Sequence, residues 1–371
     1  MPIVLDGSQG ISTPMYAGSI TSNPVTPSVN MKNRIINGNM TIDQRNAGAS
    51  VTPTNDAYTL DRWQVNISDN SKFTIQQSST APAGFKNSLL VTSSSAFSLA
   101  AGSYFVLDQK IEGFNTADLN FGTANAQTVT LSFWVRSSLT GTFGGVLRNS
   151  AENRSYPFTY TISSANTFEY KTVTVAGDTS GTWIGATNGV GLYVGFGLGV
   201  GATYSGTAGA WAGATYASAT GATSVVSTNG ATWYITGVQL EVGSTATSFD
   251  YRNYTTELQL CQRYLPAFNS ANTFDYVGFG FTTGTTNAQM TFQYYVPPRV
   301  APTGVTNSTA SNFLFYYGPA SHTVSAFTFV GGGSRMSIMN CTISGGPAGG
   351  TSGVLFANSA TAQLLFTGCE L

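Results

Sequence analysis

The chain contains a single histidine, so catalysis by a histidine base has one residue to use. His322 lies in the segment GPASHTVS, between Ser321 and Ser325. A serine, a histidine and an acid form a catalytic triad only when the fold brings them together in the right geometry. The surrounding Gly, Pro and Ser residues are typical of a loop beside a strand. We therefore predict a loop or surface histidine without a catalytic role.

Carboxylate pairs are the other route to catalysis, because glycoside hydrolysis needs only two acids at a set separation. Asp108, Glu112 and Asp118 lie close together in VLDQKIEGFNTADLN, and Lys110 alternates with them. This alternation is typical of a solvated strand edge followed by a turn, which is how we interpret the cluster. No catalytic residue is predicted, and the chain is not expected to be an enzyme.

The cysteines do not form a recognisable framework. Cys261, Cys341 and Cys369 are too few and too scattered for a set of disulfides or a zinc site. Buried free thiols are the state expected in a reducing cytoplasm, and a bridge between Cys341 and Cys369 is the alternative. With one histidine and no calcium loop of the EF-hand type, the sequence predicts neither a metal nor a cofactor.

Glycine occupies almost every second position in GVGLYVGFGLGVGATYSG, residues 189–206, and no charged residue occurs from 179 to 240. A membrane-spanning helix needs roughly 20 mainly apolar residues and tolerates glycine poorly. A phosphate-binding loop needs G-x-G-x-x-G at the start of a helix. The stretch fits neither, so membrane insertion and nucleotide binding are not expected. Its period of two predicts a long strand with one aliphatic face and one bare glycine face.

Aromatic residues among small polar ones are the best candidates for ligand binding. Sugars stack on aromatic faces and bond to amides and hydroxyls, with little need for net charge. The loop 202–218, ATYSGTAGAWAGATYAS, follows the glycine strand and could cover its bare face or bind a sugar. YYGPASH (316–322) and GGGSR (331–335) are predicted tip loops near the end of the chain. The predicted ligand-binding residues are Tyr204, Trp211, Tyr216, Tyr316, Tyr317 and Arg335.

The remaining tryptophans are divided by their context. Trp63, Trp134 and Trp233 lie inside strand patterns and are predicted to be core residues. Trp183, in DTSGTWIGATNG, fits neither a strand nor a clear loop and is left unassigned.

Composition narrows the class of protein. Charged residues make up 8% of the 371-residue chain, against roughly 25% in ordinary soluble domains. The formal net charge of −1 leaves no basic field for nucleic acid and no polybasic patch for anionic lipid. Aromatic residues reach 12%, which excludes disorder and, with many Thr, Val and Gly residues, predicts an all-β protein.

The elements that would position these residues are short strands separated by turn formers. They favour a jelly-roll β-sandwich followed by a smaller C-terminal β-domain, joined by one short helix and preceded by an extended N-terminal arm. Thr255 or Thr256 is the predicted helix N-cap, Leu258, Cys261 and Leu265 form the apolar stripe, and Pro266 ends the helix. The predicted strands are 58–67, 72–79, 103–111, 128–137, 156–162 and 168–175 in the sandwich, and 274–281, 288–296, 311–317, 323–330, 336–343 and 362–368 in the second domain.

These patterns divide the chain into four parts. Residues 1–33 are predicted to be an extended arm, 34–252 a jelly-roll domain, 253–266 a linker helix and 267–371 a C-terminal β-domain.

Five motifs in a fixed order carry a resemblance. NRIINGNMTIDQRNAG (33–48), YTLDRW (58–63), TLSFWVRSSLTGTFGGVLRNS (130–150), GATWYITGVQLEVGSTATSFDYR (230–252) and ELQLCQRYL (257–265) resemble tail-fibre-type virion proteins of tailed bacteriophages. The central part is also similar to the galactose-binding-like jelly roll of carbohydrate-binding modules. The resemblance covers residues 33–265.

This resemblance implies an external virion component, made in the host cytoplasm and assembled as a homotrimer. The arm 1–33 would attach to other virion proteins, and the rest would recognise host surface polysaccharide or lipopolysaccharide without cleaving it. Two alternatives stay open. The chain could be a head-decoration or cement protein with a purely structural role, or a depolymerase of surface glycan.

Overall fold

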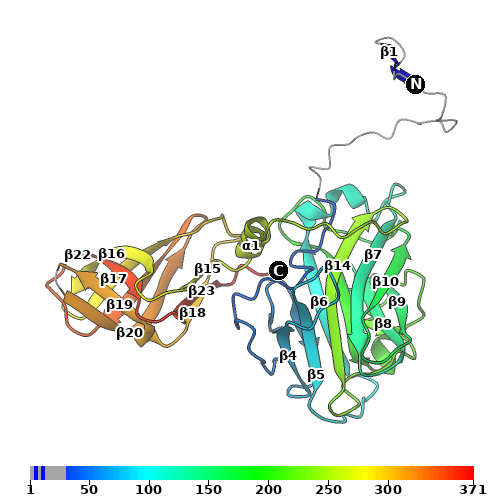
Figure 1. Ribbon diagram of the computed structural model, residues 1–371, viewed down its shortest axis with the longest axis horizontal. Coiled ribbons are helices and arrows are strands. Elements are labelled where there is room, and N and C mark those ends of the chain that lie inside the picture. The colour runs from blue at the N-terminus through cyan, green and yellow to red at the C-terminus, as the bar shows by residue number, and fades with distance from the viewer. Residues whose placement is uncertain (1–3, 7–9, 13–30, 319) are drawn as a thin grey trace. The chain divides into compact units, whose positions relative to one another are not determined.

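The computed structural model describes residues 4–6, 10–12, 31–318 and 320–371. Val4–Asp6 (β1) pairs antiparallel with Gly10–Ser12 (β2), and the rest of the predicted arm up to residue 30 lies outside the described residues. Asn33–Leu371 forms a separate compact unit, whose strands and single labelled helix are shown in Figure 1.

The predicted all-β fold is confirmed, and its larger part is a sandwich of two five-stranded sheets. Their neighbouring strands run antiparallel, and the inward-facing residues of both sheets form one core around Trp63, Phe133, Phe196 and Trp233. The first sheet has the order β10 (Glu169–Val175), β7 (Val129–Ser137), β14 (Thr232–Val242), β5 (Ser88–Ser93) and β4 (Phe73–Ser78). The second has the order β3 (Gln64–Ile67), β6 (Tyr104–Glu112), β11 (Val190–Val200), β8 (Gly141–Arg148) and β9 (Ser155–Ile162).

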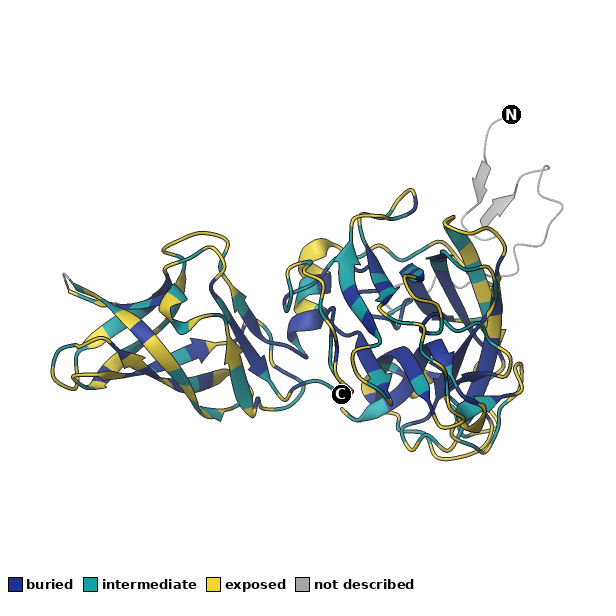
Figure 2. Ribbon diagram, turned by 90° about the horizontal axis from the view of Figure 1, so that it is seen from below, coloured by how far each residue is buried: buried dark blue, intermediate teal, exposed yellow. Residues whose placement is uncertain are grey.

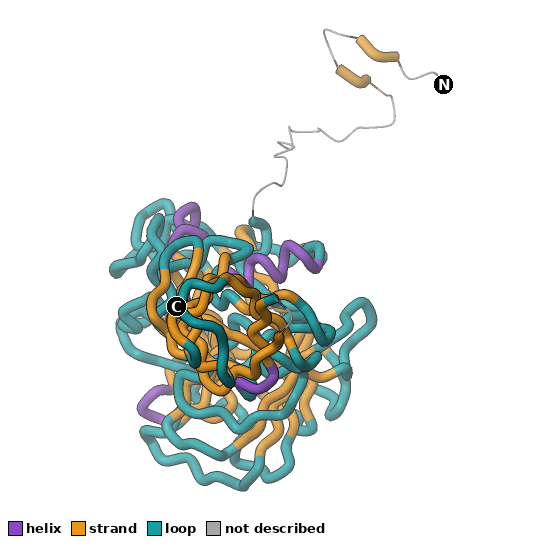
Figure 3. Tube along the Cα trace, turned by 90° about the vertical axis from the view of Figure 1, so that its left-hand side faces the viewer, coloured by secondary structure: helices purple, strands orange, loops and turns teal. Residues whose placement is uncertain are grey.

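The C-terminal part is a closed six-stranded barrel beside a three-stranded sheet, and it has its own core around Phe292, Phe313, Phe315 and Met339. Figure 2 shows buried and exposed positions alternating along the barrel strands. Figure 3 shows how strands dominate over helical segments. The barrel consists of β16 (Tyr276–Gly284), β17 (Asn287–Gln293), β21 (Met336–Ile343), β20 (Ala320–Gly332), β19 (Phe313–Tyr317) and β22 (Ser352–Ala357), and the sheet of β15 (Ala267–Asn269), β23 (Gln363–Thr367) and β18 (Gly304–Asn307).

The glycine stretch is the central strand of the second sheet, β11, as its period predicted. Leu192, Val194, Phe196 and Leu198 are fully buried in the core. The glycine face is covered by the same chain, and the covering residues come from several segments. The loop after β11 contributes through Ser218 of the short strand β13 (Ser218–Ala219), which pairs with β12 (Ser205–Gly206), rather than through Trp211. The residues that cover the glycine face are Thr116 and Ile184 at Gly191, Ser218 at Gly197, and Ser224 and Val226 at Gly199.

The predicted helix is present as α1 (Tyr254–Gln262), but its predicted N-cap is wrong. Asn253 is the cap, because its side-chain oxygen accepts a hydrogen bond from the backbone N–H of Thr255. The buried face of the helix includes Cys261, which packs with Ile36 and Ile42. The helix is therefore packed onto the segment that precedes the sandwich.

The residues that follow α1 are held to the sandwich by an ion pair between the buried Glu112 and the partly exposed Arg263. Glu112 accepts hydrogen bonds from Arg263 Nε and Nη2 at 2.9 and 2.6 Å and from Tyr264 Oη at 2.7 Å. Although burial opposes the shift, the bonds from Arg263 and Tyr264 lower the pKa of Glu112 below its ordinary value. The interpretation of Glu112 as part of a solvated edge is wrong, because a local pattern does not show that a distant arginine covers the strand end.

Gly191 gives a direct test of the packing on the glycine face. A Cβ at Gly191 would lie 2.2 Å from Thr116 Oγ1, 2.8 Å from Gly113 Cα and 2.9 Å from the Ile184 carbonyl oxygen. Gly191→Ala is expected to lower the free energy of unfolding by about 1–3 kcal/mol, because two of these atoms are backbone. Denaturant unfolding followed by tryptophan fluorescence measures the change.

Gly189→Ala is the matched control for this test. A Cβ at Gly189 meets its nearest atoms at 3.5–3.7 Å, which is ordinary van der Waals contact. This variant should stay within about 0.5 kcal/mol of the wild type. Equal stability of the two variants would contradict the packing described for β11.

Candidate functional site

The outer face of the first sheet carries a hollow with a volume of about 610 Å³, within the range of roughly 300–1,000 Å³ that is typical of small-ligand sites. Its floor is formed by Ser132 and Trp134 of β7 and by Gly237 of β14. Trp134 is half-buried and points outward, because Phe133 and Val135 on the alternate positions are fully buried in the core. We call this hollow the aromatic groove.

The prediction for the strand tryptophans is thus partly wrong. Trp63 and Trp233 are fully buried core residues, as predicted. Trp134 belongs to the outer face instead. Ser132 and Arg136 share its face in the strand alternation, and their polarity is the signal that could have identified it.

A bulge in β14 shapes the floor of the aromatic groove. The pairing of β14 with β7 shifts register between Thr236 and Gln239, and Gly237 has a φ of +60°. A Cβ at Gly237 would lie 2.7 Å from Phe85 Cζ and 3.1 Å from Trp134 Cδ1. Glycine is needed here both for the backbone conformation and for the approach of these two rings.

One wall of the groove is a chain segment that crosses the outer face of the sheet after β14. Glu241 accepts hydrogen bonds from the backbone N–H and the hydroxyl of Thr247 at 2.8 and 2.6 Å. Gln239 accepts one from the N–H of Asp250 at 2.8 Å. Because Gln239 and Glu241 are buried, these bonds hold the segment firmly and fix the side chains of Phe249 and Tyr251.

Five aromatic rings line the groove. Trp134 and Tyr170 have ring centroids 5.4 Å apart. Phe85, Phe249 and Tyr251 form a second group, with centroids 4.9–5.5 Å apart. Tyr170 is 43% exposed and Tyr251 58% exposed, so the rings present large apolar faces to solvent.

The groove is electrically neutral. No aspartate, glutamate, lysine, arginine or histidine lines it, and the polar lining consists of hydroxyl and backbone groups. Burial raises the pKa of Tyr251 further above its ordinary value of 10.0, at which the hydroxyl is already protonated at neutral pH. A ligand that fits this surface has apolar faces for stacking, polar groups at its edges and no net charge.

The predicted site residues lie elsewhere. Trp211 packs edge to face against Phe121, Tyr156 and Trp183 at 5.3–5.9 Å, and its indole N–H donates to the Ala176 carbonyl at 2.7 Å. This cluster also gives Trp183, unassigned from sequence, a packing role.

Tyr204 and Tyr216 lie on the same loop but outside the Trp211 cluster. Tyr204 packs against Tyr104 at 5.4 Å and lines a separate hollow of about 310 Å³. The Tyr216 ring lies against Gly206, where a Cβ would clash with it. The loop therefore does not present its three aromatic rings as one surface.

The three predicted residues of the barrel do not form one site. Tyr317 pairs with Ala320 at the start of β20, whereas Arg335 follows the end of that strand. A strand of this length separates them by roughly 40 Å. Tyr316 is 40% exposed, next to Tyr317 on β19.

His322 was predicted to lie in a loop or at the surface; it lies on β20 rather than in a loop, but its side chain is only partly buried. Its ring stacks on Tyr317 with centroids 5.0 Å apart, and Nδ1 is 3.3 Å from the Ser344 carbonyl oxygen. Gly318 is a turn residue, and β20 begins at Ala320, two residues before the histidine.

Asp108 also contradicts the interpretation of a solvated strand edge. Its side chain is fully buried on the outer face of the second sheet, and neither carboxylate oxygen accepts a hydrogen bond from the residues that the structure describes. Arg148 Nη2 lies 3.8 Å from Oδ2. Burial raises the pKa of Asp108 to about 6. Asp118 remains exposed and pairs with Arg34.

The described part of the chain has no group of three or more His, Cys, Asp or Glu side chains placed to hold a metal ion. Among the described residues, no helix has the length and apolar character needed to cross a membrane. All three cysteines are buried as free thiols, and burial raises the pKa of Cys341 and Cys369 to about 12.

Comparison with known proteins gives structural matches only. No protein-family model matches the chain, and no curated protein matches its sequence. The enzymatically active domain of bacteriophage CBA120 tailspike protein 4 matches with 14% identity and a TM-score of 0.33, over 57% of this chain and 22% of that chain.

Two sugar-binding structures give comparable matches. A putative sugar binding protein from Bacteroides thetaiotaomicron is 14% identical, with a TM-score of 0.33, over 57% of this chain and 100% of that chain. The module TmCBM61, in complex with β-1,4-galactotriose, is 10% identical, with a TM-score of 0.29, over 57% of this chain and 99% of that chain.

The buried carboxylate of Asp108 leads to a pH-dependent prediction. Its folded-state pKa of about 6 lies above the ordinary value of 3.8, so the folded protein binds this proton more tightly than the unfolded chain. Stability from this group therefore increases as the pH falls from about 6 to about 4. Asp108→Asn should raise the free energy of unfolding at pH 7.5 by about 1–3 kcal/mol and weaken the pH dependence.

Urea unfolding at pH 4.5, 6.0 and 7.5 measures this effect. Arg148 keeps its ion pair with Glu152 at 2.6 Å in the variant, so no new unpaired charge is created. Asp118→Asn, at an exposed ion pair, should change stability by no more than about 1 kcal/mol. An Asp108→Asn variant that is less stable at pH 7.5 and keeps the wild-type pH profile would show that the carboxylate is favourable where it lies.

Proposed function

We propose that this chain is a non-catalytic virion protein of the fibre type, which binds an uncharged surface glycan through the aromatic groove. The observation that carries the proposal is the groove itself, with five aromatic rings and no charged residue in its lining. Sugar rings present C–H faces that stack on aromatic rings, while their hydroxyls bond to polar groups at the edges.

The neutrality of the groove selects among surface glycans. Sites that bind phosphorylated or carboxylated sugars typically contain arginine or lysine, which bond to the anionic groups. Neither residue type lines the groove. A neutral polysaccharide segment, or the neutral part of a lipopolysaccharide, is therefore the ligand proposed. Weak single contacts of this kind reach useful strength when several copies bind together.

The assembly proposed is a homotrimer attached to other virion proteins through residues 1–33, which places the protein on the exterior of the particle. The barrel supports burial between copies, because Phe279 and Phe281 on β16 are 61% and 44% exposed. Apolar rings on a domain with few charges are typical of surfaces that pack against another subunit.

Two other functions predict different observations. A head-decoration or cement protein would also bury the exposed barrel residues, but it would be found on the head when the particle is imaged. A glycan depolymerase would release reducing ends from host polysaccharide. Glu112, in the acidic cluster considered for catalysis, already bonds to Arg263 and Tyr264 and is not available to a substrate.

Trp134→Ala tests the aromatic groove. Loss of a stacking face is worth about 1.4 kcal/mol, so binding of neutral host polysaccharide should weaken at least about tenfold. The measurement is the dissociation constant from calorimetry or from a glycan array, with near-ultraviolet circular dichroism as the check on folding.

Trp211→Ala is the matched control, because Trp211 is also half-buried but lies in the cluster with Phe121 and Trp183. Its binding should equal that of the wild type. The reverse pattern, with binding lost in Trp211→Ala and kept in Trp134→Ala, would move the site to the loop 202–218 and reject the groove.

Deletion of residues 1–32 tests the attachment arm. Asn33 must be kept, because its side chain is buried and its Nδ2 donates to the Val238 carbonyl at 3.1 Å. The truncated protein should fold and form its normal oligomer, yet fail to load onto particles. Truncated protein recovered in purified virions at the wild-type level would exclude attachment through this segment.

A further inference from the structure

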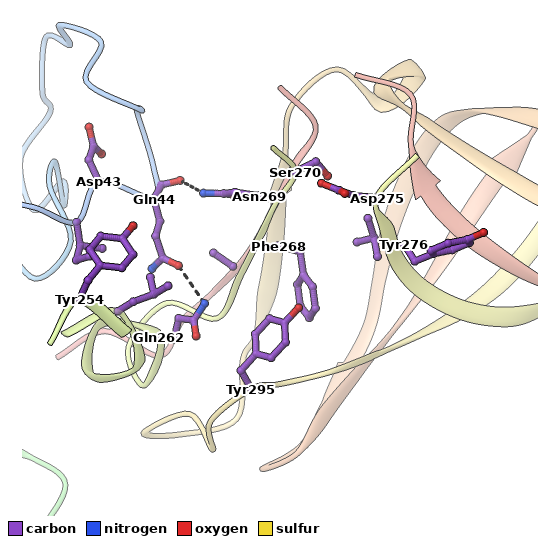
Figure 4. Close-up of a pocket in the computed structure, with 14 residues that line it drawn as sticks. Asp43, Gln44, Tyr254, Gln262, Phe268, Asn269, Ser270, Asp275, Tyr276 and Tyr295 are labelled. Carbon is purple, nitrogen blue, oxygen red and sulfur yellow. Dashed lines mark hydrogen bonds between the residues drawn. The ribbon is translucent and has the colours of Figure 1, made fainter. Parts of the chain in front are cut away.

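A second hollow, of about 460 Å³, lies where α1 and the barrel domain approach each other, and we call it the cleft (Figure 4). One side is formed by α1 and residues 42–44, and the other by residues 267–270, 275–277 and Tyr295. These segments are far apart in the sequence, and none of them contributes to the aromatic groove.

The two sides of the cleft are held together by Gln44. Its backbone N–H and its side-chain Nε2 donate to Asp61 at 2.6 and 2.7 Å, which anchors it to the sandwich. Its carbonyl oxygen accepts hydrogen bonds from Asn269 at 2.8 Å and Gln363 at 2.6 Å, both from the C-terminal part. The cleft is therefore formed before any ligand arrives, which lowers the entropic cost of binding.

Three tyrosines line the cleft, and Figure 4 shows their positions. Tyr254 is 62% exposed, Tyr276 is 81% exposed and Tyr295 is 72% exposed. None of their hydroxyls bonds to another residue of the described chain, and the Tyr295 ring packs against Phe268 at 5.7 Å. Exposed rings with free hydroxyls beside a hollow offer both stacking faces and hydrogen-bonding groups.

The charges in the lining exclude one class of ligand. Its charged residues are Asp43 and Asp275, and no lysine, arginine or histidine lines it. Asp275 Oδ2 accepts from the N–H groups of Ala271 and Asn272 at 3.0 and 3.1 Å, which leaves Oδ1 free to accept from a ligand hydroxyl. Carboxylate oxygens attract hydroxyl donors and repel anions.

We propose that the cleft is a second glycan-binding site, which takes an uncharged oligosaccharide and rejects carboxylated sugars. This inference rests on the proposed function, since it assumes a protein that binds glycans. Each chain then has two sites on different faces, and a long polysaccharide that reaches both gains avidity within one copy.

The experiment uses the full chain and an array that carries neutral oligosaccharides beside carboxylated ones of the same length. The best neutral binder is then titrated by calorimetry against the wild type and two double variants. Trp134→Ala with Tyr170→Ala disables the groove, and Tyr276→Ala with Tyr295→Ala disables the cleft. Phe114→Ala, at a ring 57% exposed outside both sites, is the matched control.

We expect two ligands per chain in the wild type and in Phe114→Ala, and one in each double variant. In the background without the groove, the cleft substitutions should weaken the remaining binding at least tenfold. Asp275→Asn in that background should raise the relative binding of carboxylated oligosaccharides.

The outcomes separate the two proposals. If disabling the groove abolishes all binding, the cleft is rejected and the proposed function stands. If the wild type binds none of the neutral oligosaccharides, the proposed function fails and the cleft with it. If the wild type binds one ligand, which only the cleft substitutions remove, the cleft is correct and the groove is rejected.

Discussion

The arrangement of residues 33–371 depends on the contacts of the buried Arg62 guanidinium. It pairs with Glu370 at 2.6 Å, donates to the Lys110 carbonyl and lies 3.6 Å from the ring centroid of Tyr264. These partners come from the end of the chain, from β6 and from the residues after α1. Removing one partner of such a buried pair typically costs about 3–5 kcal/mol, because the remaining charge is left uncompensated.

The groove is neutral because the chain has few charged residues and uses several of them in ion pairs elsewhere. Several of the few ionic groups form buried or partly buried pairs, such as Arg62 with Glu370 and Arg263 with Glu112. Such pairs add little net stability. Arrangements that leave one of the charges buried and unpaired are costly, so the pairs restrict how the segments pack against each other. The lining of the aromatic groove is left with rings, hydroxyls and backbone groups, which suit an uncharged ligand.

The sequence predicted what depends on local periodicity. The glycine stretch became β11, and the fold class, the helix and the core roles of Trp63 and Trp233 follow from period and composition. Alternation shows which residues share a face, but it does not show which face is covered by distant segments. Asp108 and Glu112 were misjudged for this reason. The cleft could not be predicted, because its walls meet only in the folded chain.

A buried side-chain amide that donates a hydrogen bond to a carboxylate lies beside both the groove and the cleft. Gln239 donates to Glu241 at 2.8 Å beside the groove, and Gln44 donates to Asp61 at 2.7 Å beside the cleft. Glu241 also accepts from the N–H of Thr247, and the backbone carbonyl of Gln44 accepts from Asn269. These bonds hold the segments whose side chains form one wall of the groove and one wall of the cleft. Fully satisfied buried networks resist rearrangement. Both surfaces therefore keep their shape without a ligand, which is the condition under which weak stacking contacts give measurable affinity.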